Sequence, residues 1–259
     1  MNDPVLRLQE KGGVLTLLLN RPQKRNALNR ELVGSLADAL NEAREMEAVK
    51  VILIRGAGSD FCAGADLAEL EAVLDQPAEA GLADARRLGA LLLSMRRHPK
   101  PILAVVHGRA LAGGCGLASA CDMVLAREDS EFGYPEVFLG FVPAMVMAIL
   151  RRKLPEGRAF ELVATGRRVS AEEGRAMGLV NHVFPAADFE SRVEAFATEL
   201  ASRPASALAL IKSLLYEQGD LSMAEGIERG ARVNVQARQT EACREGVRAV
   251  LEGKRGGRK

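Results

Sequence analysis

Two glycine-rich segments could place backbone N–H groups around an anionic oxygen. In the first, the apolar run Ile102–Val106 predicts a buried strand, and Gly113, Gly114 and Gly116 then open a helical run of small residues. Glycines at a helix N-terminus leave N–H groups and the positive end of the helix dipole open to a ligand. The same glycines would also suit a turn that only packs strand and helix closely, and this segment alone leaves both interpretations open.

The second segment repeats the order of strand, glycine-bearing loop and helix. Val51–Arg55 predicts a strand, Gly56–Gly64 a loop, and Asp66 a cap for a helix over Leu67–Leu74. Two N–H groups that converge make an oxyanion hole, and a nearby carboxylate can move protons beside a polarised carbonyl. The pattern therefore favours enolate chemistry on a thioester.

Other enzyme signatures are incomplete in this sequence. Gly56-Ala-Gly58 lacks the third glycine of a dinucleotide fingerprint, because Phe61 stands in its place, and Gly114 stands where a phosphate loop has lysine. Ser119 lacks the glycine-flanked elbow of a serine hydrolase, and the three histidines are scattered. We therefore expect no nucleotide loop, no serine triad and no metal site.

The composition is that of an ordinary globular protein. The 259 residues are 48% hydrophobic, and 35 basic against 34 acidic residues give a net charge of +1, which argues against a nucleic-acid or membrane partner. The four cysteines show no metal-type spacing and no secretory segment precedes them, so we expect a reduced, cytoplasmic protein. The basic end Gly253–Lys259 predicts a solvated tail.

The elements that must position these segments alternate between strands and helices and then become almost wholly helical. A hairpin is expected around Gly12 and Gly13, and Asn29 is expected to cap a helix that ends near Met46. Further along, the patterns predict these elements: helix Leu82–His98 after a break at Pro77–Gly81, strand Met123–Ala126, a strand-like Glu131–Pro143, strand Val180–Phe184, and helices Ala144–Lys153, Pro155–Thr165, Ala171–Met177, Asp188–Ser202, Pro204–Tyr216 and Met223–Glu252.

Several motifs carry a family resemblance. In order they are Phe61-Cys-Ala-Gly-Ala-Asp-Leu67, His107-Gly-x-Ala-x-Ala-Gly-Gly-Cys-Gly-Leu117, Cys121-Asp122, Phe132-Gly-x-Pro-Glu136 and Leu139-Gly-x-x-Pro143. With these the chain resembles the enoyl-CoA hydratase/isomerase, or crotonase, family over nearly its whole length. The resemblance implies an α/β fold, a crotonase-like spiral of ββα turns. It also implies a core with the CoA and active sites at 1–200 and a helical region at 201–259 that forms a homotrimer or a dimer of trimers.

The resemblance also implies catalytic roles for three residues. The N–H groups of Ala65 and Gly113 match the positions that hold the thioester oxygen as it becomes an enolate, and Glu136 matches the catalytic glutamate. Because Glu136 follows Pro135 and precedes an apolar run, we expect a partly buried carboxyl with a raised pKa.

Further residues are assigned by resemblance to binding an acyl-CoA. Ala63, Asp66 and Leu67 match the strip whose backbone borders the CoA adenine, and Lys24 or Arg25 matches the place where a basic side chain meets the CoA phosphates. Coenzyme A is then part of the substrate, so no separate cofactor is expected.

Three more residues complete the expected substrate site. Gly114 and Gly116 belong to the glycine segment, and the Tyr134 hydroxyl is expected near Gly116, with simple packing as the alternative. The segment Ala72–Arg86 is expected to border the acyl tunnel.

Gly116 departs from the best-known hydratases of this family, which carry a second glutamate there. Hydration needs one group to activate water and a proton for the α-carbon, whereas moving a double bond needs only one base. Some family hydratases, including ones that act on branched substrates such as methylglutaconyl-CoA, also have glycine at this position. We rank enoyl-CoA hydratase first because the segment after Gly133 resembles hydratases more. An isomerase that shifts the double bond from position 3 to 2 with Glu136 as single proton shuttle comes second, and a non-catalytic acyl-CoA-binding homologue third.

Overall fold

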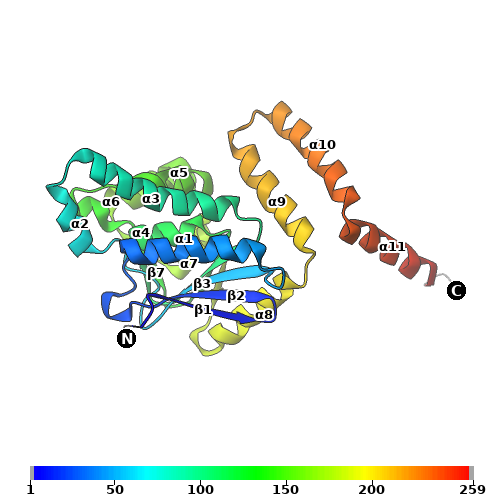
Figure 1. The fold of residues 1–259 in the computed structure, drawn as a ribbon, viewed down its shortest axis with the longest axis horizontal. Coiled ribbons are helices and arrows are strands. Elements are labelled where there is room, and N and C mark those ends of the chain that lie inside the picture. The colour runs from blue at the N-terminus through cyan, green and yellow to red at the C-terminus, as the bar shows by residue number, and fades with distance from the viewer. Residues whose placement is uncertain (1–2, 257–259) are drawn as a thin grey trace.

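A six-stranded sheet forms the centre of the chain (Figure 1), in the order β1-β2-β3-β4-β6-β9. The structure is a computed structural model that describes residues 3–256. β1 pairs antiparallel with β2, and the other neighbours run parallel. The strands are β1 (Leu6–Lys11), β2 (Val14–Leu19), β3 (Val51–Gly56), β4 (Ile102–Val106), β6 (Met123–Arg127) and β9 (His182–Phe184).

The central strands β3 and β4 are buried on both faces, which explains why Val51–Ile54 and Ile102–Val106 read as continuous apolar runs, whereas the edge strand β1 is exposed beyond Leu6. Ile52 and Ile54 belong to the larger core, while Leu53 faces the opposite side and packs with α8 (Phe189–Ala201). Alternate side chains of a strand point to opposite faces, so a strand covered on both sides must be apolar throughout. The helices of the larger core are α1 (Arg30–Glu45), α3 (Ala78–Arg97), α4 (Gly113–Ala120), α5 (Ala144–Lys153), α6 (Glu156–Thr165) and α7 (Ala171–Met177).

A second, three-stranded sheet lies beside the main one and anchors the segments that surround the site. Its strands are β5 (Arg109–Leu111), β7 (Glu131–Gly133) and β8 (Arg168–Ser170) in the order β5-β7-β8. β5 leads into α4, and β7 leads into the short 3₁₀ helix η2 (Pro135–Leu139).

The last three helices extend away from this body as an arm (Figure 1). They are α9 (Ala205–Glu217), α10 (Met223–Gln239) and α11 (Glu241–Gly256), and we call them the C-terminal arm. The tail beyond residue 256 and the side chains from 254 onward, which include most of the expected basic tail, lie outside the described residues.

Most of the expected elements are present, and the local signals that predicted them are visible in the structure. Gly12 and Gly13 both have positive φ in the hairpin turn, and the Asn29 side chain accepts the Leu32 N–H at 3.0 Å at the start of α1. Asp66 caps α2 (Leu67–Leu74) by accepting the Ala68 N–H at 3.2 Å.

Some boundaries were predicted wrongly. The helix expected from Leu82 begins at Ala78, because Pro77 lies just before the first turn, where its missing N–H removes no helical bond. The single helix expected over Met223–Glu252 is two helices, because Thr240 is extended and its hydroxyl caps the second by accepting the Cys243 N–H at 3.3 Å.

Two further expectations on strands were wrong in extent. The strand-like segment Glu131–Pro143 is a strand only to Gly133, and Pro135 then begins η2. The strand expected from Val180 starts at His182. Among the helices that the structure describes, none has the length and apolar character that crossing a membrane requires.

Candidate active site

Helix α4 begins at an unusual backbone turn. Ala112 has φ 50° and ψ −128°, a conformation that costs a residue other than glycine on the order of 1–3 kcal/mol. Its N–H donates to the Gly133 carbonyl at 2.9 Å, which fixes the turn against β7. Gly113, the first residue of α4, then lines the cavity described below. Strain at a helix start that opens on a cavity points to a functional role for that start.

The next glycine of this helix serves packing. A Cβ on Gly114 would lie 2.2 Å from the Cys62 carbonyl oxygen, so no side chain fits there. The two interpretations of the glycine segment therefore apply to different residues. Gly114 brings α4 against the preceding loop, and Gly113 faces the cavity.

Ala65 comes from the second glycine segment and lies beside Gly113. Leu28 bonds to both of its neighbours: the Leu28 N–H donates to the Gly64 carbonyl at 2.7 Å, and the Asp66 N–H donates to the Leu28 carbonyl at 2.9 Å. Because successive amides of an extended chain alternate in direction, the Ala65 N–H points away from Leu28. A Cβ added to Gly113 would lie 3.7 Å from the Ala65 nitrogen, so the two amides stand at one edge of the cavity.

A buried asparagine holds the loop that carries Ala65. Asn26 donates to the carbonyls of Ala57 and Asp60, both at 2.8 Å, and its side-chain oxygen accepts the Arg21 N–H at 3.0 Å. The Arg21 guanidinium lies 2.8 Å from an Asp66 oxygen, and this hydrogen bond lowers the pKa of the Asp66 carboxyl. The Asp66 charge is therefore neutralised by Arg21 and also fixes the start of α2.

Glu136 is a buried carboxyl without a full set of partners. It lies on η2, is 7% exposed and lines the cavity. Its Oε2 has no hydrogen-bond partner among the described residues. Burial raises the pKa of Glu136. A carboxyl whose charge is destabilised in this way is suited to take up and return a proton.

One cavity of about 440 Å³ brings these groups together. Seven of the residues predicted for the site line it: Lys24, Ala63, Ala65, Asp66, Leu67, Gly113 and Glu136. The rest of its wall is mainly apolar and includes Leu70, Leu88, Leu139, Phe141 and Met145. Among the described residues, the cavity lining includes Leu70 and Leu88 but none of Ala72–Arg86, so the expectation that this segment borders the acyl tunnel stays a prediction.

Four predicted site residues do not line the cavity: Arg25, Gly114, Gly116 and Tyr134. Arg25 contributes its carbonyl, which accepts the Ala63 N–H at 3.0 Å. Tyr134 is fully buried, and its hydroxyl lies 2.9 Å from the Ser119 hydroxyl, so the structure gives it the packing role and not a contact with substrate.

The space beside Gly116 is filled by a residue that the sequence did not indicate. A Cβ on Gly116 would meet Val146 Cγ2 at 2.3 Å, and Val146, on α5, also lines the cavity. Valine in an apolar helix carries no chemical signal, so only the packing of α5 on α4 identifies it. Among the described residues that line the cavity, Glu136 is therefore the one carboxylate without a cationic partner.

Comparison with known proteins decides the family. A profile described as enoyl-CoA hydratase/isomerase matches residues 9–256. The chain belongs to this family. A protein of Thermus thermophilus named "Putative enoyl-CoA hydratase" is 40% identical over 243 residues, 94% of this chain and 96% of that protein. Enoyl-CoA hydratase domain-containing protein 3 of Rattus norvegicus is 31% identical and is covered over 82% of its length.

Solved structures show the same fold. An enoyl-CoA hydratase of Mycobacterium smegmatis superposes with a TM-score of 0.93 at 31% identity, with 97% of both chains covered. An enoyl-CoA hydratase from Polaromonas sp. JS666 gives a TM-score of 0.91 at 32% identity. The expected crotonase fold with helices at its C-terminus is thereby confirmed. The family description includes both hydratases and isomerases, so membership fixes the substrate class more closely than the reaction.

Proposed function

We propose that this protein is an enoyl-CoA hydratase that adds water to a 2-enoyl-CoA thioester. The observation that carries the proposal is the buried carboxyl of Glu136, with an unpartnered oxygen, in the same apolar cavity as the amides of Ala65 and Gly113. The amides stabilise the thioester oxygen as it becomes an enolate, and each such donor lowers the barrier by about 3 kcal/mol in acyl-transfer enzymes. The hydratase names of similar proteins support the reaction class.

A single carboxyl can carry out the whole hydration. The ionised Glu136 takes a proton from water while the water oxygen bonds to C3 and the C2–C3 π electrons move to the enolate. Protonated Glu136 then returns that proton to C2, which regenerates the ketone-like thioester and the free carboxylate. Water is consumed whole, and both new bonds form on the face of the substrate that Glu136 occupies.

One observation favours an isomerase as the second candidate. Val146 fills the space beside Gly116, so the cavity wall offers Glu136 as its one carboxylate without a cationic partner among the described residues. In that reaction Glu136 removes a proton from C2 of a 3-enoyl-CoA, the amides hold the enolate, and Glu136 returns the proton to C4. A non-catalytic acyl-CoA-binding homologue, the third candidate, would show neither reaction.

The proposal also assigns residues to the CoA portion of the substrate. Lys24, Ala63, Asp66 and Leu67 all line the cavity. We propose that Lys24 meets the CoA phosphates and that the backbones of Ala63, Asp66 and Leu67 border the adenine. Coenzyme A enters as part of the substrate. Among the described residues no group of three or more His, Cys, Asp or Glu side chains is placed to hold a metal ion.

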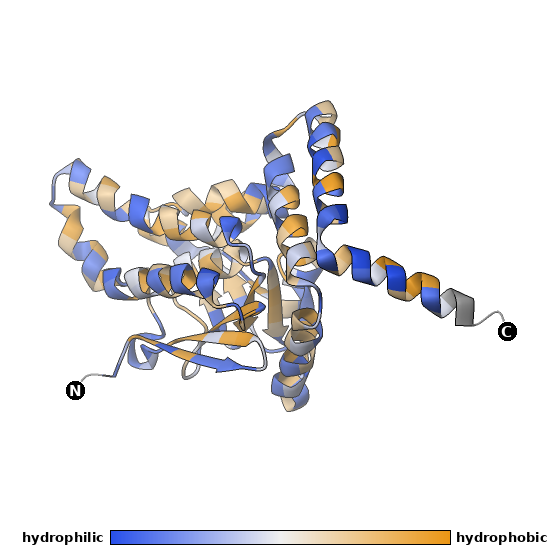
Figure 2. Ribbon diagram, turned by 45° about the vertical axis from the view of Figure 1, so that its right-hand side comes forward, coloured by the Kyte–Doolittle hydropathy of each residue, from blue (hydrophilic) through white to orange (hydrophobic). Residues whose placement is uncertain are grey.

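We further propose that residues 201–259 mediate assembly into a homotrimer or a dimer of trimers, with 1–200 as the catalytic core. Apolar residues recur along the helices of the arm, which Figure 2 shows as orange bands between blue ones, and several of their side chains are exposed. Met223 is 84% exposed and Ile227 69%, and apolar area of this extent is normally covered by another chain. Light scattering coupled to size exclusion measures the mass, and a monomer at micromolar concentration would contradict the assembly.

Parallel assays with a 2-enoyl-CoA and a 3-enoyl-CoA test the reaction. We expect water addition to the 2-enoyl substrate without a double-bond shift, and a loss of kcat of about 10²–10⁴-fold in Glu136→Gln, the usual contribution of a general acid–base. A double-bond shift as the only reaction would replace the hydratase proposal by the isomerase. Equal rates for Glu136→Gln and the unaltered protein would remove Glu136 from the mechanism.

A further inference from the structure

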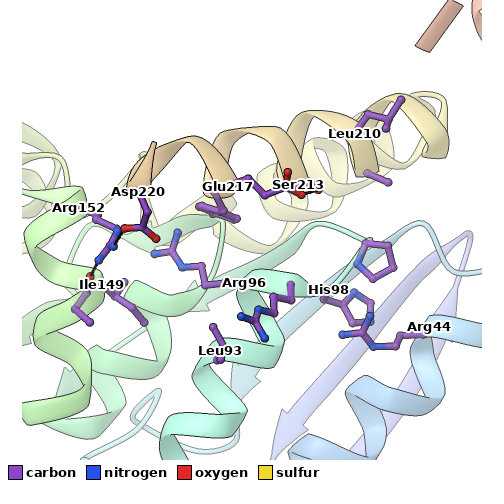
Figure 3. A pocket seen from close by; sticks show the side chains of 15 residues that line it. Arg44, Leu93, Arg96, His98, Ile149, Arg152, Leu210, Ser213, Glu217 and Asp220 are labelled. Atoms are coloured by element: carbon purple, nitrogen blue, oxygen red, sulfur yellow. Dashed lines mark hydrogen bonds and ion pairs between the residues drawn. The ribbon is translucent and has the colours of Figure 1, made fainter. Parts of the chain in front are cut away.

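A buried lysine on α9 connects the arm to the core. Lys212 is the single buried residue of α9, all of which the structure describes, while Ile211 and Leu215 on the same helix are 63% and 62% exposed. A cavity of about 860 Å³ separates α9 from α3 and α5 (Figure 3). Within the described chain, the apolar packing of α9 against α3 and α5 is therefore incomplete. The contacts that join α9 to the core at this place are mainly polar.

Those polar contacts converge on Asp122. The Lys212 ammonium lies 2.7 Å from Asp122 Oδ2, and the Tyr216 hydroxyl donates to Oδ1 at 2.8 Å. From the core, the Ile102 N–H donates to Oδ2 at 2.7 Å, and Lys212 also donates to the Lys100 carbonyl at 3.0 Å. One carboxylate thus joins α9 to the beginning of β4. The two side chains of this ion pair are only 7% and 13% exposed, and a buried ion pair of this kind adds little net stability because both charges lose their hydration.

The same carboxylate lies directly beyond the C-terminal end of α4. The last turn of that helix is held by cations from neighbouring helices: Arg96 donates to the Ser119 carbonyl at 2.9 Å, and Lys153 donates to the Cys121 carbonyl at 3.1 Å. Positive side chains at this end complement the helix dipole. Arg96 also stacks on the Tyr216 ring, 4.4 Å from its centre, so α9 reaches α4 by a second route.

We propose that Asp122 is a positioning residue that couples the C-terminal arm to the N–H groups at the start of α4. This inference rests on the proposed oxyanion role of Gly113. Helix α4 has eight residues, about 12 Å, and is buried from Gly114 to Ala120. A short helix enclosed on all sides moves as a unit, so a displacement of its C-terminal end by α9 reaches Gly113.

Three variants test whether Asp122 couples the arm to α4 or only balances the charge of Lys212. Asp122→Asn leaves Lys212 buried without its partner and is expected to lower the melting temperature, and it can fail to fold. Lys212→Met removes the ammonium and keeps an apolar stem of similar length. The double variant Asp122→Asn/Lys212→Met removes both charges together, so we expect stability to recover while the ion pair between α9 and residue 122 stays absent.

An ion pair elsewhere on the arm provides the matched control. Arg152 on α5 pairs with Asp220 just after α9 (Figure 3), and among the described residues the polar partners of Arg152 are Asp220 and the Ala148 carbonyl, neither of which is on α4. Asp220→Asn is therefore expected to keep the kcat of the unaltered protein.

The decisive readouts are kcat, KM and melting temperature of the double variant. We expect its melting temperature to recover while kcat stays about tenfold low with KM little changed, because a misplaced oxyanion donor weakens binding of the transition state more than of the substrate. A double variant with the kcat of the unaltered protein would show that Asp122 only balances charge and would overturn the coupling.

Amide hydrogen exchange tests the coupling between the arm and α4 without relying on the proposed reaction. If the unaltered protein turned over neither enoyl-CoA, the proposed function would fail, but exchange of the amides in 111–121 would still report the coupling. We expect faster exchange there in Lys212→Met than in Asp220→Asn. Equal exchange rates of these amides in the two variants would refute the coupling between the arm and α4.

Discussion

Replacing Gly113 by alanine separates the chemistry of the first glycine segment from its packing. The added Cβ would lie 3.6 Å from Leu28 Cδ1 and 3.7 Å from the Ala65 nitrogen, both ordinary van der Waals distances. Gly113 is helical and has no positive φ to preserve. The substitution is therefore expected to leave the fold intact, and glycine to alanine at a compatible site stabilises a protein by about 0.4–1 kcal/mol.

The catalytic effect follows from the same distances. An oxyanion that accepts from both amides lies about 2.9 Å from each nitrogen, and the new methyl group would occupy space between Gly113 and Ala65 beside that point. If the methyl group cancels one of the two donors, kcat/KM falls by about 10²–10³-fold, which corresponds to roughly 3–4 kcal/mol of transition-state stabilisation.

The assay compares steady-state rates on a 2-enoyl-CoA with thermal unfolding of the same preparation. Gly114→Ala is the matched control in the same helix turn: its Cβ would lie 2.2 Å from the Cys62 carbonyl oxygen, so we expect a poorly folded protein. A folded Gly113→Ala protein with unchanged kcat/KM would refute the assignment of this amide to the oxyanion site. An unfolded one would refute the packing argument.

Three further predictions concern charge and packing around the cavity. Burial raises the pKa of Glu136, so the unaltered protein loses stability as pH rises through that pKa and the carboxyl ionises. The melting temperature of Glu136→Gln minus that of the unaltered protein should therefore be larger at about pH 8 than at about pH 4. An equal difference at the two pH values would contradict this. Lys24→Ala should raise KM for the CoA ester while Arg25→Ala, outside the cavity, should not; equal effects would show that neither charge is specific. Gly116→Ala should cost about 1–3 kcal/mol in chemical denaturation, and Val146→Ala in the same chain should recover most of it unless the 2.3 Å contact is relieved elsewhere.

The fold could be predicted from the sequence where one local signal dominates. The Asn29 and Asp66 caps and the paired glycines of the hairpin each act within a few residues of themselves, and each lies where expected. Prediction failed where tertiary contacts decide. The short strands β5 and β8 were not expected, because three residues carry too little pattern and exist as strands only through pairing with β7.

The candidate site shows the same division between local and distant causes. The glycine segments and Glu136 stand in motifs, so their place at one cavity could be expected from sequence. The contact of Val146 with Gly116 and the ion pair at Asp122 depend on which helices pack against α4. Residue type and spacing in the sequence do not predict either contact. Tyr134 was expected to bring its hydroxyl near Gly116, and that hydroxyl lies 2.9 Å from the hydroxyl of Ser119, one turn further along α4.

The unpartnered oxygen of Glu136 favours hydration over a double-bond shift. Among the described residues Glu136 Oε2 has no donor, so an O–H or N–H group must come from the cavity, and a buried carboxylate oxygen left without one would cost about 1–3 kcal/mol. In hydration the attacking water supplies that O–H and is oriented by it before it reacts. In isomerisation the group to be deprotonated is a C–H bond, which donates weakly and leaves most of the cost in place. Val146 fills the space beside Gly116, so in the hydration that we propose Glu136 is the one carboxylate of the described cavity wall that can orient the water, and the direction of its Oε2 would set the face of the substrate to which water adds.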